Sequence, residues 1–380
     1  MKYKKTIFIS VFISVIYFLI SSPVIVYAYE NDENISGYIE NYFDYSDINP
    51  YITEEIKNIF DFGDSDIKSI SDIRNLNLSE LFEYILKNVK DNIQKPFKYL
   101  ISVFILLTIS YFINSINGLS TNRIFFDKIC LMANVILIYD LFFHCFEDIC
   151  NIINRCSEFF MAFIPVFSST ILLSSGTVTA SGYSAILLTL SDIIVQITNN
   201  CVIPFLYICF ALAVCDSVNS FFSFKTIIKH INKIIQICIK LFLSIYSGIL
   251  SIQTIINSNA DGIGNKTVKL LITSSIPIVG SSISEAYGSV KSCINILKSG
   301  LGTMAIVILG VYIIPVIIEI IIYRFTFMSA SIISEMYGKN DFMDFFNTVE
   351  IVFSIAYALL ITVFSVFVIS IAIVLITSKI

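Results

Sequence analysis

Residues 164–169 read IPVFSS, and residues 276–282 read the similar IPIVGSS. A second Ile-Pro pair follows each stretch at nearly the same distance, Ile203-Pro204 after the first and Ile314-Pro315 after the second. Duplicated apolar units that contain prolines are typical of transporter-like membrane folds. Because isoleucine is abundant in this chain, chance recurrence of Ile-Pro is the alternative to a true duplication.

The composition is that of an integral membrane protein. Hydrophobic residues make up 56% of the chain and charged residues only 14%, whereas a soluble domain carries about 25% charged residues. The nine cysteines include no CxxC pair, and there are only two histidines, so the ligand spacing of a zinc or redox site is missing. The sequence also has no Walker-type nucleotide loop, catalytic triad or nucleic-acid-binding basic patch. It therefore predicts neither an enzyme nor a cofactor.

The N-terminus has the pattern of a secretory signal peptide. Three lysines precede an apolar stretch at 6–20, and Val26-Tyr27-Ala28 supplies the small residues of a cleavage site. We predict a signal peptide over 1–28 that is cleaved after Ala28; an uncleaved signal anchor is the alternative. Either way, the segment that follows is exported.

The segment 29–95 is predicted to be a small, partly helical extracytoplasmic region. Between Tyr29 and Leu86 there are 14 acidic residues and three basic ones. Apolar residues at helical spacing near its end predict an amphipathic helix leading to Pro96, with Ser79 as its N-cap.

Residues 96–380 form the predicted membrane domain of an all-α polytopic protein. Six stretches reach the length of about 20 residues that a bilayer requires: 97–116, 129–147, 186–215, 234–256, 302–323 and 351–377. Two weaker stretches, 159–174 and 270–297, are rich in Ser and Gly. Such stretches suit re-entrant or broken helices, which occur only where protein or a wet cavity surrounds them.

Loop lysines and arginines predict the topology. With residue 29 outside, the three inner loops all carry basic residues, namely Arg123 and Lys128, then Lys225, Lys229 and Lys233, then Arg324. Four lysines on the outer side (266, 269, 291 and 298) weaken this assignment. It makes the two repeats, 134–216 and 245–327, parallel copies related by an axis along the membrane normal.

Polar residues inside spans mark candidate sites, because charges within a bilayer are costly. Asp192 and Gln196 share one helical face with Asn199 and Asn200; this face is either hydrated or packed against another helix. Glu319 lies in an otherwise apolar run, where it either lines a pathway or extends towards the inner end near Arg324. The candidate kink or pathway residues are Pro165, Pro204, Pro277, Pro315, Asp192, Glu319, Gln196 and Asn200. A packing kink with no role in motion is the alternative for the prolines.

The order of these features resembles the stage III sporulation protein AE family. The likeness is carried by residues 276–286, by Gly300-Leu301-Gly302-Thr303, by Ile314-Pro315 with Glu319, and by the stretch 165–182. The resemblance implies a membrane component of the mother cell–forespore channel, a secretion-like complex needed for endospore development. It implies a location in the mother-cell membrane around the forespore. The implied partners are other proteins of the same operon, the forespore-side channel protein and the lipid bilayer, and a homo-oligomer is a further expectation. The resemblance supplies no catalytic residues.

The alternative function is a self-sufficient secondary transporter for a small solute, built on the two parallel repeats. Such a transporter is expected to place ionisable groups at matching positions in both copies. Glu319 instead aligns near Tyr207 or Ile208, and Asp192 near Thr303 or Met304. The mismatch favours a component of a complex.

Overall fold

The fold is described from a computed structural model, which covers residues 47–60, 77–116, 120–175, 177–218, 224–275 and 280–377. These residues belong to one compact unit, 43–380. The predicted signal peptide, its cleavage site after Ala28, and Pro277 lie outside the described residues.

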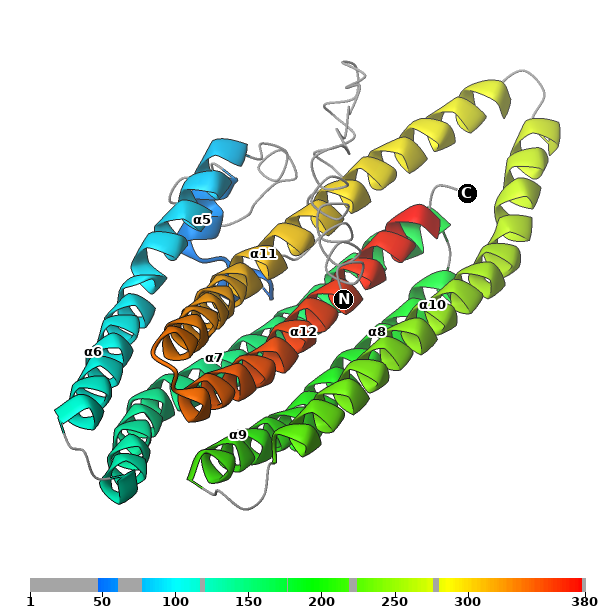
Figure 1. Ribbon diagram of the computed structural model, residues 1–380. Helices are drawn as coiled ribbons and strands as arrows, with labels where there is room; N and C mark the ends of the chain where they lie inside the picture. The colour runs from blue at the N-terminus through cyan, green and yellow to red at the C-terminus, as the bar shows by residue number, and fades with distance from the viewer. Residues whose placement is uncertain are drawn as a thin grey trace. The chain divides into compact units, whose positions relative to one another are not determined.

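Helices account for nearly all of the described chain (Figure 1). In chain order they are η1 (Asn49–Tyr51), α3 (Glu54–Ile59), α5 (Leu78–Asn92), α6 (Gln94–Ile116), α7 (Ser120–Ser175), α8 (Thr177–Ile197), the π-helix η2 (Thr198–Val202), α9 (Ile203–Val218), α10 (Lys225–Ser275), α11 (Gly280–Met336) and α12 (Asn340–Thr377). No strand occurs among the described residues. The all-α prediction is confirmed.

Among the residues that the structure describes, six helical stretches are long and apolar enough to cross a membrane, as predicted. They cover Ser79–Ile113, Phe125–Thr170, Ser181–Ser217, Lys225–Leu250, Gly300–Met336 and Asn340–Ala372. Each contains, or largely overlaps, one of the six spans expected from the sequence. The chain is therefore a multi-pass membrane protein.

The helices are much longer than the spans that the sequence indicated. At 1.5 Å per residue, the 56 residues of α7 reach about 84 Å, whereas the hydrocarbon core of a bilayer is about 30 Å thick. Residues 148–158, which lie between the second predicted span and the first Ser/Gly-rich stretch, continue the helix, and their charged side chains are exposed.

The first Ser/Gly-rich stretch, 159–174, also continues α7, and the helix runs through Pro165 without a break. Aromatic stacking supports this part of the helix. The ring centroid of Phe163 lies 5.8 Å from that of Phe159 and 4.9 Å from that of Phe167. The chain turns back only after Ser175, into α8. The second stretch, 270–297, divides between the end of α10 and the start of α11.

The core is built from phenylalanine side chains on different helices. Phe142 of α7 stacks on Phe210 of α9 with ring centroids 3.9 Å apart, and it contacts Phe353 of α12 edge-on at 6.0 Å. All three are buried. Lipid is as apolar as these rings, so their close packing, rather than exclusion of water, holds the helices together.

Ion pairs join three helix connections at one end of the bundle. Lys339, between α11 and α12, donates to both carboxylate oxygens of Asp127 on α7 at 2.6 and 2.8 Å. Lys128 pairs with Asp341 at 3.0 Å and donates to the backbone oxygen of Ser217, near the end of α9, at 2.7 Å. The ends of α6, α9 and α11 therefore lie on one side (Figure 1), as the alternation of spans requires. We call this the paired end.

Arg324 does not lie at the end of its helix; its predicted place at the inner end of a span stays a prediction. α11 continues for another three turns to Met336, and Arg324 is half-buried against α12. The sequence could not show this, because its partner, Glu350, is 26 residues away.

Two long helical hairpins correspond to the predicted repeats. One is α7 followed by α8, η2 and α9, and the other is α10 followed by α11. The prolines occupy different local structures: Pro165 and Pro315 lie inside helices, and Pro204 is the second residue of α9, which follows the π-helix. The duplication stays a prediction.

The amphipathic helix before Pro96 is α5, but its N-cap was predicted wrongly. The side chain of Asn77, not Ser79, accepts hydrogen bonds from the backbone N–H groups of Ser79 and Glu80, at 3.1 and 3.4 Å. Asparagine caps helices as well as serine does, and here it comes two residues earlier.

Candidate functional site

Pro315 leaves a backbone acceptor inside α11, and another helix uses it. Proline has no N–H, so the carbonyl of Val311, four residues earlier, lacks its usual helical donor. The hydroxyl of Tyr84 on α5 donates to this oxygen at 2.9 Å. The neighbouring Tyr312 hydroxyl donates to the backbone oxygen of Tyr51. The two bonds attach η1 and α5 to α11, which gives the candidate residue Pro315 a structural role.

Glu319 is half-buried one turn after Pro315, and it belongs to a cluster of ionisable groups. It hydrogen-bonds with Tyr323 and interacts electrostatically with Asp148, Lys95 and His144. These residues come from three helices, α11, α7 and α6. The structure thus gives Glu319 neighbours that its apolar sequence context did not indicate.

Arg324 and Glu350 form an ion pair between α11 and α12. The Nε and Nη2 atoms of Arg324 donate to Oε1 of Glu350 at 2.9 and 2.7 Å, and the two side chains are 27% and 28% exposed. The guanidinium also lies over the ring of Tyr357, 5.5 Å from its centroid, where it gains a cation–π contact. Glu319 and Arg324 therefore belong to different groups of contacts.

The predicted polar face on α8 exists and points away from the core. Asp192, Gln196 and Asn200 are exposed, and the Gln196 amide donates to Asp192 at 2.9 Å. Asn199 is half-buried and donates to Asn154 of α7 at 3.0 Å. Three residues of this face are therefore exposed, as expected for a hydrated face, whereas Asn199 packs against another helix.

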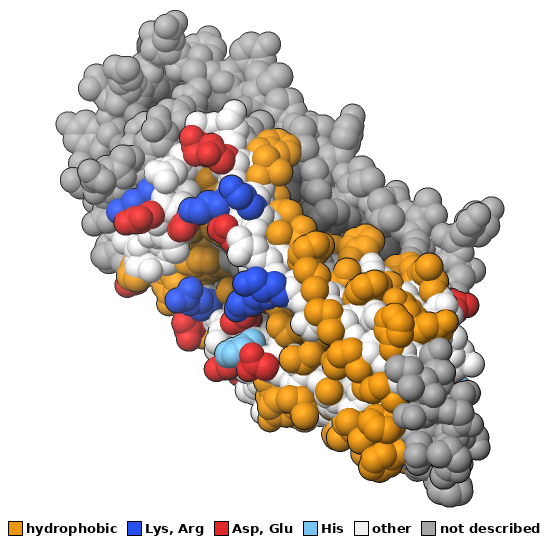
Figure 2. All heavy atoms as spheres, turned by 60° about the vertical axis from the view of Figure 1, so that its left-hand side comes forward, with side chains coloured by type: hydrophobic (Ala, Val, Ile, Leu, Met, Phe, Trp, Pro, Cys, Tyr) orange, Lys and Arg blue, Asp and Glu red, His pale blue; other side chains and the backbone are white. Residues whose placement is uncertain are grey.

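A row of exposed polar side chains also runs along α7. Its spacing is three or four residues, which places it on one side of the helix. The row comprises Asp140, His144, Glu147, Asn151, Arg155 and Glu158. His144 and Asp140 lie 3.6 Å apart and are 69% and 81% exposed. Figure 2 shows charged side chains gathered beside a broad hydrophobic surface.

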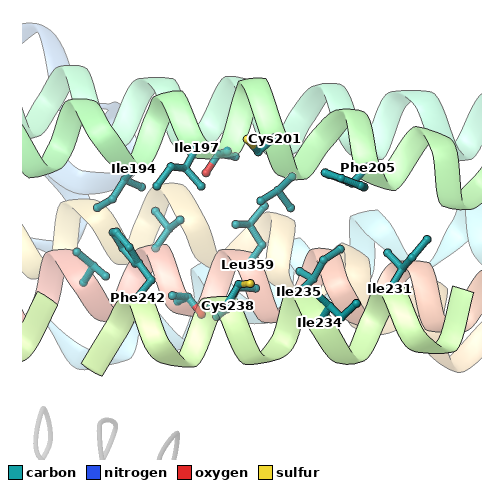
Figure 3. A pocket seen from close by; sticks show the side chains of 16 residues that line it. Ile194, Ile197, Cys201, Phe205, Ile231, Ile234, Ile235, Cys238, Phe242 and Leu359 are labelled. Atoms are coloured by element: carbon teal, nitrogen blue, oxygen red, sulfur yellow. The ribbon is translucent and has the colours of Figure 1, made fainter. Parts of the chain in front are cut away.

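The π-helix η2 lies beside an apolar groove of about 540 Å³. A π-helix carries one extra residue in a turn and is frequent at functional sites. The groove is enclosed by α8 and η2, by α10 and by α12, and Figure 3 shows Cys201 and Cys238 on its opposite walls. The candidate residue Pro204 is the second residue of α9, and it lies between Val202 and Phe205, which line the groove. Pro165, in contrast, lies exposed within the outer part of α7.

The candidate residues are thus not brought together into one site. Asp192, Gln196 and Asn200 share a surface, Pro315 and Glu319 lie on successive turns of α11, and Pro204 borders the apolar groove. No group of three metal-ligating side chains occurs among the described residues.

Comparison with known proteins identifies the family. Residues 62–378 match the sequence profile of stage III sporulation protein AE. The chain belongs to the stage III sporulation protein AE family. The stage III sporulation protein AE of Bacillus subtilis (strain 168) is 24% identical to it over 237 residues, 61% of this chain and 58% of the relative. The alignment covers less than two thirds of that relative's length. No solved structure matches the chain significantly.

Membership of the stage III sporulation protein AE family gives the chain a role in sporulation. The resemblance noted from the sequence is therefore confirmed, and its motif at Ile314-Pro315 coincides with the turn of α11 that binds α5. The sequence missed the exposed row on α7. Its spacing of three and four residues was a usable signal. The partners of Arg324 and Lys339 had no local signal.

Proposed function

We propose that the chain is a structural membrane component of the channel or secretion-like complex that joins mother cell and forespore, with a conduit or scaffold role rather than a catalytic one. The observation that carries the proposal is the family match over residues 62–378. The complex, its partners and its location are what that family resemblance implies.

Helix length supports a role in connecting components. Because α7 and α11 are each about 85 Å long, more than half of each helix extends beyond a bilayer core of about 30 Å. A protein that only passes a solute across one membrane has no need for such extensions. A protein that meets others outside the membrane does, and the docking of Tyr51 and Tyr84 on α11 would fix the exported region to the spans.

Exposed polar faces also support assembly with other proteins. Charged side chains in a membrane helix are costly unless they meet a partner or a water-filled cavity. The exposed rows on α7 and α8 lie on helices that qualify as spans. We propose that the partners are other proteins encoded in the same operon and the forespore-side channel protein, in the mother-cell membrane around the forespore.

Deletion with a tagged complement tests the proposal. We expect the deletion strain to stop sporulation after engulfment and the tagged protein to restore it, with the tag surrounding the forespore. A deletion strain that completes sporulation, or a tag spread evenly over the mother-cell membrane, would contradict the proposal.

The Glu319 cluster supports the second candidate, a secondary transporter. Ionisable groups from α6, α7 and α11 converge at a half-buried carboxylate, as in ion-coupled sites. Solute uptake by the purified protein alone in vesicles, lost in Glu319→Gln, would establish this function in place of the first.

A further inference from the structure

The apolar groove beside η2 lies in the hydrocarbon core of the membrane. Its lining residues on α10 fall between 231 and 242, inside the span Lys225–Leu250, which has 26 residues. A bilayer core takes up about 20 helical residues, and every section of that length within this span contains 231–242. Across the groove, the lining residues at 194–205 occupy the centre of the span Ser181–Ser217. Lipid tails therefore surround the groove.

The walls of the groove are hydrocarbon on three sides. α8, η2 and the start of α9 form one wall, α10 forms the opposite wall, and α12 closes the third side (Figure 3). Among the described residues, no charged side chain lines the groove, and its polar side chains are Thr198, Thr362 and the thiols of Cys201 and Cys238. The Thr362 hydroxyl donates to the backbone oxygen of Ala358 at 2.7 Å. A buried water needs about two to four polar partners, so these walls suit neither water nor a charged solute.

The groove is open to the surface of the spans. Ile197 and Phe205 on one wall and Ile234 on the other line the groove and are also exposed. Leu359 of α12, in contrast, lines the groove and is buried. A lipid tail can therefore enter from the surrounding bilayer and reach α12 without a change in the fold.

The width of the groove fits a hydrocarbon chain and is too small for a helix. Residues 231–242 rise by about 16 Å along α10, so the volume of about 540 Å³ corresponds to a cross-section of about 33 Å². An α-helix with its side chains is about 10 Å across and occupies about 80 Å². A stretched methylene chain, whose carbons contact their neighbours at about 4 Å, needs roughly 15 Å². An acyl chain can enter the groove, whereas the helix of another protein cannot.

We propose that the groove is a lipid-binding site that holds an acyl chain of a phospholipid from the surrounding bilayer. A chain in the groove contacts α8, α10 and α12 at once, whereas a lipid on the outer surface contacts the protein on one side. Within a membrane, packing of this kind rather than exclusion of water provides the attraction. The lipid in the groove therefore exchanges more slowly than the lipids around the protein.

The bound chain completes the packing of α10. Among the spans that the structure describes, Lys225–Leu250 is the least buried, with 12% of its apolar window inside the fold. Its side chains at the groove face α8 and α12 across the space that the lipid fills. The lipid is thus part of the contact between α10 and the rest of the membrane domain. This inference does not depend on the proposed role in a sporulation complex.

Retention of phospholipid by the full-length protein tests the proposal. After extensive washing in detergent, we expect the wild type to retain one phospholipid per chain, counted by mass spectrometry. Cys201→Phe/Cys238→Phe fills the groove from opposite walls and should retain none. Cys215→Phe, at an exposed cysteine of α9 outside the groove, is the matched control and should retain the lipid. A wild type without phospholipid, or equal retention by the filled variant, would overturn the proposal.

Photolabelling gives a second measurement that needs no substitution. The wild type is placed in nanodiscs of phosphatidylethanolamine and phosphatidylglycerol that contain a phospholipid with a diazirine in its acyl chain. Labelling of Leu359 and Thr362, on the α12 side of the groove, should exceed labelling of Ile105 and Ile109, exposed on α6. Label on α6 without label on α12 would show lipid at the outer surface only and would overturn the proposal. So would unlabelled α12 in chains that form dimers linked through Cys201, because a second copy would then cover the groove.

Discussion

Removal of the Tyr84 hydroxyl probes how α5 is held to α11. Tyr84→Phe deletes the donor to the Val311 oxygen, a bond of 2.9 Å in partly buried surroundings. No helical N–H replaces the lost donor, because residue 315 is proline. The substitution therefore leaves a carbonyl without a partner.

The expected cost follows from this unpaired carbonyl. A buried acceptor without a partner costs about 1–3 kcal/mol, and partial burial favours the lower part, about 1–2 kcal/mol. Such a loss changes an opening equilibrium by about 5- to 30-fold. The effect should be local to α5, because Tyr84 is its link to Val311.

Amide hydrogen exchange of α5 measures this local opening. We expect Tyr84→Phe to speed exchange in α5 by about 5- to 30-fold. In the background of Pro315→Ala, the new N–H can pair with the Val311 oxygen, so adding Tyr84→Phe should have little further effect. Tyr111→Phe, at an exposed tyrosine of α6, is the control. Equal acceleration in both backgrounds would refute the assignment of the Val311 carbonyl as the acceptor that proline sets free.

Three further outcomes are expected. Glu350→Gln should lower the melting temperature by several degrees, because loss of one partner of a largely buried ion pair costs about 3–5 kcal/mol. The double variant Arg324→Met/Glu350→Leu should lose less stability than the two single variants lose together. Additive losses of stability would count against coupling between the two side chains. Lys339→Met, which leaves the Asp127 carboxylate without its ammonium, should destabilise more than Lys87→Met at an exposed site; equal melting curves would contradict the paired end. Maleimide in detergent should label exposed thiols and spare buried ones in mass spectra, and labelling of the buried thiols in the folded protein would contradict the packing. Among the described cysteines, the exposed thiols are Cys201, Cys215 and Cys238, and the buried ones are Cys130, Cys145, Cys156 and Cys209.

The sequence predicted the spans well, because a run of about 20 apolar residues in a chain this poor in charge has few other uses. It could not predict how far each helix continues. Residues 148–158 have the composition of a loop, yet they remain helical because their polar side chains lie on the outer surface of α7. Pro165 similarly stays within a helix, where stacked rings such as Phe163 and Phe167 replace the stabilisation of the lost hydrogen bond.

The candidate site was only partly predictable. Asp192 and Gln196 were assigned to one face from helical spacing alone, and the structure places them there in contact. The neighbours of Glu319 come from helices far apart in the sequence, as does the Tyr84 hydroxyl that uses the carbonyl freed by Pro315. Spacing within one helix reveals faces, whereas contacts between helices depend on packing that no local pattern encodes.

Isolation of the tagged, functional protein from sporulating cells after chemical cross-linking tests the proposed role most directly. Mass spectrometry of the isolated material should identify proteins of the same operon together with the forespore-side channel protein. Recovery of this chain without any of those proteins, under conditions in which the tagged protein supports sporulation, would contradict the assignment to a complex joining the two cells.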